Sequence, residues 1–340
     1  FQYGTGPIRG FAVTLSIGIV VSMFTALVVT KLFFALIAAH TKVASLKMLQ
    51  IVGSTAVDFV GKRKAAALVS IVVIVASLGL MVVRGTRDTG AVLGIDFTGG
   101  TLIEVVYSQD VDVEEIREQL AEGGYGDAMI QRFGTPRDIL IRVAPQDEIT
   151  NEKISNDVFA LLEANPDNKP ELRRVEFVGP QVGDELTEKG GLAMLYSLIA
   201  ILIYVALRFE WRFAVGSIIA LVHDVIFTVG LFSILWATFD LPVLAAILAV
   251  IGYSLNDTIV VYDRIRENFR KIRKGSPIDI INISLNQTLS RTIITSLTTF
   301  VVLLSLFLFG GEIIHGFATA LMIGVVIGTY SSIFVASVAV

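Results

Sequence analysis

The sequence contains no cysteine, so this chain can form neither a disulfide-stapled domain nor a thiolate metal site. It also lacks a G-x-x-x-x-G-K-S/T loop and a G-x-G-x-x-G turn after a strand, the common nucleotide-binding motifs. No His-Glu-x-x-His pattern is present, so a catalytic zinc has no support. We therefore expect no enzyme activity, no cofactor and no bound metal.

Charged residues are scarce as well, at 17% against 54% hydrophobic residues. The apolar residues are concentrated in seven stretches, each long enough to cross a hydrocarbon layer of about 30 Å with about 20 residues. These stretches lie near residues 11–30, 65–83, 190–207, 213–238, 241–262, 291–311 and 316–340. The pattern predicts a multi-pass membrane protein whose membrane part is an all-α bundle of seven transmembrane helices.

Two clusters of basic residues predict the orientation of the chain, because short loops rich in Lys and Arg stay in the cytoplasm. One cluster lies between Lys31 and Lys64, and the other follows Tyr262, within residues 264–290. We expect the N-terminus of this fragment outside and the C-terminus in the cytoplasm. Partner or lipid binding by the second cluster stays an alternative. Ser276, Pro277 and Asp279 predict a capped helix start within that loop.

The outside loop, residues 84–189, has about twice as many Asp and Glu as Lys and Arg. Such an acidic domain would repel nucleic acid and anionic lipid, so we expect neither as a ligand. Its alternating segments predict strands at 101–108, 128–133, 139–143 and 173–178, with helices at 113–122 and 148–164 and a turn at 134–136. This order is that of an α+β ferredoxin-like (βαββαβ) domain.

An internal repeat joins the two ends of the chain. Residues 10–29 align without gaps with residues 316–335, and eight of these twenty positions are identical. The shared glycines, such as Gly18 and Gly324, are not explained by hydrophobicity alone. The first helix is thus predicted to end an earlier half, followed by one complete half of six helices and an outer domain. Transporters built from such repeats place the working site between the two bundles.

A few charged residues lie inside the predicted helices, where each would cost at least about 3 kcal/mol without a partner or water. Asp257 lies in the fifth stretch, and Arg291 opens the sixth, with Thr295 one turn further on. One hypothesis is a proton relay, in which Asp257 binds and releases a proton, Arg291 favours its charged form and Thr295 supplies a hydroxyl. The alternative is a static ion pair between Asp257 and Arg291.

Asp224 is a second acid within the helices, in the fourth stretch. It is a candidate relay residue, with a packing hydrogen bond as the alternative. His223 points to a different face, because adjacent helical residues are 100° apart, so the two side chains need not act together. Tyr262 and Asp263 resemble the pair of intramembrane aspartyl proteases, but no G-x-G-D partner follows, which argues against that activity.

The segment GIDFTGGT, residues 94–101, is the most distinctive motif outside the helices. Gly94 opens it, Asp96 can accept hydrogen bonds from freed backbone N–H groups, and Gly99 and Gly100 allow a backbone path that a Cβ would block. We interpret these residues as a structural hinge or bulge leading into the sheet. Direct contact with a substrate is the alternative.

Six motifs resemble the SecF part of the SecD/SecF family of bacterial protein-translocation subunits, within the resistance-nodulation-division superfamily. They are VDFVGKRK at 57–64, GIDFTGGT at 94–101, VGPQVGDEL at 178–186, FEWRF at 209–213, LVHDV at 221–225 and GYSLNDTIVVYDRIREN at 252–268. The resemblance covers residues 57–340, and the first residues resemble the last SecD helix. The whole thus resembles the C-terminal end of a fused SecDF chain.

The resemblance implies a division of the chain into five parts. Residues 1–34 hold the last transmembrane helix of a SecD-like half, 35–64 a cytoplasmic linker, 65–83 the first SecF-like transmembrane helix, 84–189 the periplasmic domain, and 190–340 five further transmembrane helices. In the family, the acid of the GYSLND motif and the arginine and threonine of the next helix are linked to proton conduction. They fall here on Asp257, Arg291 and Thr295.

The resemblance also implies a function, namely a proton-driven accessory to protein export in the bacterial cytoplasmic (inner) membrane. The implied partners are the SecYEG channel, SecA, YajC, the translocating preprotein, the missing SecD half and protons. Two alternatives stay open, which are a superfamily relative that exports lipids or small molecules, and a passive scaffold of the translocon. The outer domain is smaller than the porter domains that such exporters usually have.

Overall fold

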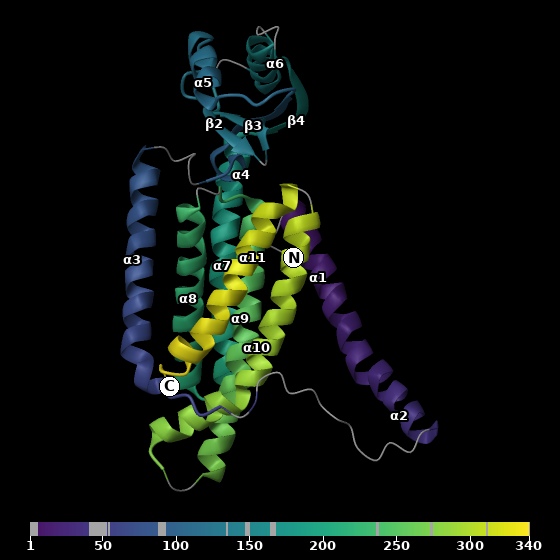
Figure 1. Cartoon of the computed structure of the whole chain (residues 1–340), viewed down its shortest axis with the longest axis vertical. Coiled ribbons are helices and arrows are strands. Elements are labelled where there is room, and N and C mark those ends of the chain that lie inside the picture. Colours follow the sequence, from purple (N-terminus) through teal and green to yellow (C-terminus); the bar gives the residue numbers. More distant parts are fainter. Residues whose placement is uncertain are drawn as a thin grey trace.

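The computed structural model describes residues 6–40, 53, 55–87, 93–133, 135–146, 150–163, 168–235, 238–272, 275–310 and 312–339. It consists of a bundle of long helices with a small α+β domain at one end (Figure 1). The chain enters the small domain after helix α3 and leaves it through helix α7. The predicted architecture of a helical membrane bundle with a small sheet domain is confirmed.

Seven helical segments are long and apolar enough to span a membrane, as predicted. The bundle is formed by α1 (Gly6–Phe24), α2 (Thr30–His40), α3 (Arg63–Arg87), α7 (Pro180–Arg208), α8 (Trp211–Ile234), α9 (Leu241–Lys271), α10 (Pro277–Phe309) and α11 (Glu312–Ser331). A short 3-10 turn, η2 (Val60–Lys62), precedes α3. The π-helical turn η1 (Thr25–Val29) joins α1 and α2 into one of the seven segments, and a second π-helical turn, η4 (Ser332–Ala336), follows α11. Helices α3, α8 and α10 each run from one end of the bundle to the other (Figure 1).

Several helices are longer than the apolar stretches that hydropathy alone predicts. Pro180 takes the first helical turn of α7, which begins inside the segment assigned to the outer domain. Most of the loop predicted at 264–290 is helical, because α9 continues to Lys271 and α10 begins at Pro277. The predicted capping box between Ser276 and Asp279 starts α10 and is confirmed.

The small domain contains α4 (Ile95–Thr98), β1 (Gly100–Tyr107), α5 (Val113–Glu122), β2 (Met129–Phe133), β3 (Thr135–Val143), α6 (Asn151–Leu162) and β4 (Pro170–Val178). The strands form one antiparallel sheet in the order β2-β3-β1-β4, which is the predicted ferredoxin-like arrangement. Residues such as Ile103, Ile141 and Leu120 fill the space between the sheet and its two helices. Parts of the predicted turn at 134–136 and helix at 148–164 lie outside the described residues.

Helix α9 is the central element of the bundle, and α8, α10 and α11 pack against it. Its residues Ile247, Ile251 and Tyr262 are almost fully buried. Helices α1 and α2 form a separate, largely exposed arm at the edge of the bundle (Figure 1). The bundle core is thus built around the helix that carries Asp257.

The predicted internal repeat extends to backbone geometry. In the alignment of residues 10–29 with 316–335, the π-helical turn η1 corresponds to η4 within one residue. A π-helical turn widens a helix locally and is rare outside functional regions. Its recurrence in both helices supports a common origin for them.

Candidate functional site

Asp257 is the acid at the centre of the candidate site. It lies on α9, is 7% exposed, and accepts two hydrogen bonds from hydroxyl groups. Thr292 Oγ1 of α10 donates to its Oδ1 at 2.7 Å, and Ser332 Oγ of η4 donates to its Oδ2 at 2.6 Å. Hydroxyl groups stabilise a carboxylate but leave the group free to take up a proton. Asp257 of α9 is therefore held by hydroxyls from two other elements, and it forms no ion pair with a described residue.

Arg291 forms no ion pair with Asp257 in the described chain, and this corrects the predicted pair. The side chains of Arg291 and Thr295 are both exposed, and Thr295 Oγ1 donates to the backbone oxygens of Arg291 and Thr292 at 2.9 and 3.0 Å. The reason is helical geometry, because Thr292 faces α9 and its neighbour Arg291 is turned away by 100°. Within the described chain, the predicted ion pair between Arg291 and Asp257 is absent, and the role of Thr295 in a water chain stays a prediction.

Asp224 of α8 forms a second cluster of the same kind. It is 1% exposed, and its Oδ2 accepts from Ser254 Oγ at 2.5 Å and from Ser331 Oγ at 2.7 Å. His223 Nδ1 lies 2.9 Å from Asp224 Oδ1, so the two side chains do meet although their backbone positions diverge. The other ring nitrogen, Nε2, lies 3.0 Å from Ser70 Oγ of α3. Helical position alone did not require His223 and Asp224 to meet, but their side chains are hydrogen-bonded.

The two acids are connected through α11. Ser331 donates to Asp224, and the next residue, Ser332, donates to Asp257. Adjacent helical residues diverge by about 100°, which lets one turn of α11 reach α8 on one side and α9 on the other. Ser254, one of the residues bonded to Asp224, lies three positions before Asp257 on α9. The two acids are therefore bound by neighbouring hydroxyls at the junction of α11 and η4.

Two glycines bring α11 close enough to α9 for these hydrogen bonds. A Cβ at Gly324 would lie 2.0 Å from Val250 Cγ2, and one at Gly328 would lie 3.0 Å from Ser254 Cβ. The spacing Gly-x-x-x-Gly places both on one face, a common way for membrane helices to approach closely. Sequence reasoning noted Gly324 only as part of the repeat and missed Ser254, Ser331 and Ser332. The signal was present, because the serines follow Gly328 by three and four residues.

The GIDFTGGT segment lies at the junction of the small domain and the bundle. Gly99 and Gly100 have φ values of 72° and 116°, in the left-handed region that favours glycine. Asp96 does not bond within its own turn as predicted, because its Oδ2 accepts from the Leu241 backbone N–H at 2.9 Å. Burial raises the pKa of Asp96 above its usual value. Burial also raises the pKa of Asp240, next to Leu241, to about 6, and the nearby Asp96 carboxylate adds to the rise.

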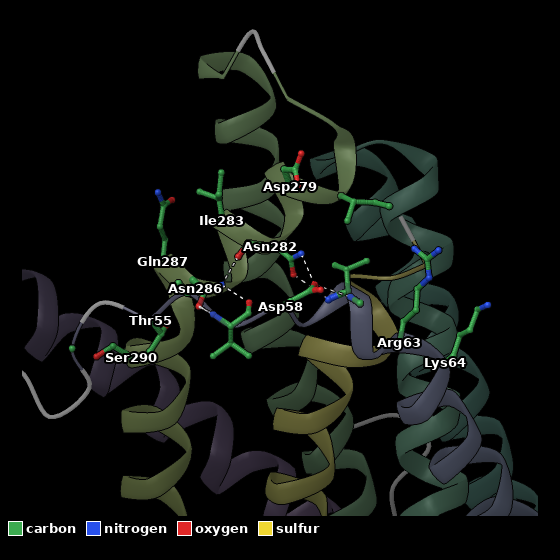
Figure 2. Close-up of a pocket in the computed structure, with 16 residues that line it drawn as sticks. Thr55, Asp58, Arg63, Lys64, Asp279, Asn282, Ile283, Asn286, Gln287 and Ser290 are labelled. Atoms are coloured by element: carbon green, nitrogen blue, oxygen red, sulfur yellow. Dashed lines mark hydrogen bonds between the residues drawn. The ribbon is translucent and has the colours of Figure 1, made fainter.

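A hollow of about 1220 Å³ lies at the opposite end of the bundle, between segment 55–64 and α10 (Figure 2). Asn282 accepts hydrogen bonds from two backbone N–H groups of segment 57–60 and donates to Asp58 Oδ1. Asn286, one turn later, binds both the N–H and the carbonyl of Val57. These bonds explain the VDFVGKRK motif as a clip that fastens the start of α3 to α10.

The described part of the chain contains no group of three or more His, Cys, Asp or Glu side chains that could hold a metal ion. The described polar partners of the buried Asp224 and Asp257 are hydroxyls and the His223 ring. Such groups can bind, hold and pass protons.

Comparison with known proteins identifies relatives along most of the chain. Residues 158–340 match the family described as "Protein export membrane protein SecD/SecF, C-terminal", and residues 89–111 match the "SecD/SecF GG Motif". "Protein translocase subunit SecF" of Vibrio alginolyticus is 57% identical over 244 residues, which is 72% of this chain and 78% of that protein. The protein of the same name from Pseudomonas aeruginosa is 49% identical over 282 residues, which is 83% of this chain and 90% of that protein.

Solved structures of similar proteins cover nearly the whole chain. The crystal structure of SecDF from Thermus thermophilus matches 99% of this chain with a TM-score of 0.87 and 37% identity. The structure of SecDF in a super-membrane-facing form also matches 99%, with a TM-score of 0.73 and 36% identity. The chain spans 45% of the length of each of these SecDF chains.

Proposed function

Because the chain belongs to the SecD/SecF family of protein-export membrane proteins, we propose that it is a proton-driven accessory subunit of the Sec export machinery. Proton flow through the bundle moves the small domain, which promotes translocation of preproteins. The small domain faces the outside of the bacterial cytoplasmic membrane. The basic segments and the C-terminus face the cytoplasm.

The observation that carries this proposal is the environment of Asp257. A carboxyl group in the middle of a lipid-embedded bundle is costly, and hydroxyls rather than a fixed cation surround it. A static structural acid would be expected to have a permanent positive partner. An acid bound by Thr292 and Ser332 can instead alternate between two protonation states with small rearrangements. Asp224 extends the relay through Ser331 and Ser254.

A preceding half of the transporter supplies the rest of the path. Arg291 and Thr295 lie on an exposed face of α10, where an unpaired guanidinium in lipid would be costly. The solved SecDF chains are more than twice as long as this one, and the repeat places the last helix of an earlier half in α1. We infer that this half covers α10, and that Arg291 and Thr295 join the relay from that side.

The proposed function needs an energy source and a movement between parts of the protein. A proton crossing 100 mV releases about 2.3 kcal/mol, enough to shift a two-state equilibrium by more than tenfold. The chain matches the two SecDF structures at equal coverage and nearly equal identity, but with TM-scores of 0.87 and 0.73. This difference supports a fold whose parts occupy more than one relative arrangement.

The decisive experiment compares Asp257→Asn with Asp263→Asn in the complete protein, reconstituted with the export channel in proteoliposomes. Asp263 lies on the same helix, is exposed, and pairs with Arg266. We expect Asp257→Asn to remove the stimulation of preprotein translocation by an imposed proton gradient, and Asp263→Asn to preserve it. Gradient stimulation that survives in Asp257→Asn would refute the relay.

Two alternatives give different results in the same assay. A passive scaffold would support translocation equally with and without the gradient, in both variants. A resistance-nodulation-division exporter of lipids or small molecules would show gradient-driven release of such a compound from vesicles in the absence of preprotein. The family match and the small size of the outer domain favour the export function over the second alternative.

A further inference from the structure

The segment Leu93–Gly100, here called the joint segment, lies where the small domain meets the bundle (Figure 1). It contains α4 and leads directly into β1, the strand that pairs with both β3 and β4. Any displacement of this segment is therefore passed to the middle of the sheet.

The joint segment is fastened to the start of α9. Gly94 N donates to the Phe239 carbonyl at 2.7 Å, and Leu241 N donates to Asp96 Oδ2 at 2.9 Å. The rings of Phe97 and Phe239 pack with their centroids 5.6 Å apart. The Leu241 N–H is one of the free donors at a helix start, so Asp96 completes the cap of α9 from another domain. Asp240 fills the ordinary capping position by accepting from Val243 N.

The other side of the joint segment is pressed against α7 and the sheet. A Cβ at Gly183 of α7 would lie 2.9 Å from the Phe97 carbonyl oxygen, and one at Gly100 would lie 2.5 Å from the Val143 carbonyl oxygen. Phe97 shares an apolar cluster with Leu186 of α7 and with residues at the start of α9. Because these contacts leave little space between the joint segment and its neighbours, a displacement of one is passed to the other.

We propose that the joint segment is the mechanical link that converts movement of α9 into tilting of the small domain. This inference rests on the proposed function, because it assigns the path by which a proton event at Asp257 reaches the outside. Asp257 lies sixteen residues along α9 from Leu241, which is about 24 Å of continuous helix.

The tilt of the small domain follows from its two separate attachments to the bundle. The small domain is covalently joined to α7, because only Gly179 separates β4 from Pro180, and it is held to α9 through the joint segment. When α9 shifts along its axis relative to α7, one attachment moves and the other stays. The sheet between them then tilts.

The test measures the position of the domain directly. Because the chain has no cysteine, Glu118→Cys on α5 and Leu235→Cys after α8 place two spin labels at exposed positions without background labelling. Double electron–electron resonance then gives the distance distribution between domain and bundle for the whole chain in lipid nanodiscs. We expect one narrow distribution for the parent protein.

Five variants test how the joint segment is held to α9 and α7. In Asp96→Ala the population at the parent distance should fall relative to displaced populations by about fivefold or more, the usual effect of losing a helix cap. Asp96→Asn keeps an acceptor oxygen and should restore the parent distribution, and Asp110→Ala, an exposed acid of the same domain, should leave it unchanged. Gly183→Ala should displace the domain, whereas Gly191→Ala, whose Cβ would meet nothing within 4 Å, should not.

Asp257→Asn tests the transmission. We expect it to change the label distance in the parent protein and to have no such effect when Asp96→Ala is also present. The proposal is overturned if Asp96→Ala and Gly183→Ala both keep the parent distribution, or if Asp257→Asn leaves the distance unchanged. These distances are measured without preprotein or gradient, so they stand apart from the translocation assay that tests the proposed function.

Discussion

The small domain and the bundle bury acidic side chains in opposite ways. In the domain, Asp138 and Glu104 lie on the open face of the sheet, and Arg173 Nη1 lies 3.0 and 3.7 Å from their carboxylates. In the bundle, Asp224 and Asp257 are equally buried, but their described partners are serine and threonine hydroxyls and the His223 ring. One region pairs its acids with a permanent charge, and the other does not.

This difference separates acids held by an ion pair from acids held by hydrogen bonds alone. A guanidinium stays charged at every physiological pH, so it favours the charged form of a carboxylate beside it. Hydroxyls donate to a carboxylate and also accept from a protonated carboxyl, so they stabilise both forms. The acids of the bundle therefore have partners that suit the proposed proton path, and the acids of the domain have a partner that suits a structural role.

The strongest test of this difference replaces one acid of each kind by its amide. Asp224→Asn should lower gradient-driven translocation at least about tenfold, because an amide keeps the hydrogen bonds but cannot carry a proton. Asp138→Asn should leave that stimulation intact and slightly lower the thermal stability of the domain, since one ion pair with a half-exposed Arg173 is lost. Translocation rates with and without a gradient give the first result, and thermal unfolding gives the second.

Equal losses of gradient stimulation in the two variants would contradict the distinction. His223 offers an internal check on the bundle, because Asp224→Asn preserves a partner for its Nδ1. Unchanged expression and unfolding temperature of Asp224→Asn would show that its loss of function is not a folding defect.

Much of the fold could be predicted from the sequence because its two regions carry strong periodic signals. Apolar runs longer than 18 residues identify the spans, and alternation along β1 and the 3.6-residue period of α5 identify the small domain. Boundaries such as the start of α7 at Pro180 were missed, since polar helical turns beyond the membrane look like loop in a hydropathy profile. The capping box at Ser276 was a local signal and was found.

The candidate site was predicted only in part, because helix register decides which side chains meet. Asp257 and Asp224 were identified from charge alone, yet the partners of Asp257 come from α10 and η4, and those of Asp224 from α9 and α11. Arg291 was predicted as the partner of Asp257, but its neighbour Thr292 occupies the facing position. Serines are common in membrane helices, so Ser331 and Ser332 carry little signal until the glycine spacing before them is considered.

The close approach of α9 and α11 gives the second prediction. Gly324→Ala would place a Cβ 2.0 Å from Val250 Cγ2, a stiff and fully buried side chain, so the helices must separate. We expect a loss of about 1–3 kcal/mol in stability and weaker bonding of Ser331 and Ser332 to the two acids. Thermal unfolding and gradient-driven translocation should both fall.

Gly252→Ala is the matched control, because it lies on α9 and its Cβ would meet nothing within 4 Å. It should behave as the parent protein in both measurements. If Gly324→Ala also behaved as the parent, the hydrogen bonds of Ser331 and Ser332 to the two acids would not depend on the contact between α9 and α11.

The smallest expected effect concerns pH at the junction of the two regions. Asp240 lies just before the membrane span of α9, and its pKa of about 6 exceeds the ordinary value of 3.8 mainly because of burial. A carboxyl with a raised pKa binds its proton more tightly when the domain is docked than when the group is free in water. Docking is thus fully favoured by this group below about pH 3.8, and that contribution is lost as the pH rises through about 6.

The charged groups around this position act in both directions. The charge of Asp96 adds to the rise in the pKa of Asp240, whereas the charge of Arg142 opposes it. The charged groups near Asp96 are Arg142, Arg174 and Glu176. After allowance for partial exposure, we expect docking to weaken by about 1 kcal/mol or less between pH 5 and pH 8. The distance between labels at residues 118 and 235 should therefore broaden as the pH rises.

Asp240→Asn should flatten this pH dependence, since asparagine caps a helix as well as aspartate does but does not titrate. Asp112→Asn, at the exposed cap of α5, should leave it unchanged. A broadening at low pH instead would reverse the sign of the linkage and show that the ionised pair stabilises docking. The expected direction means that an acidic outside, which drives protons inward, also fastens the domain to the helix that carries Asp257.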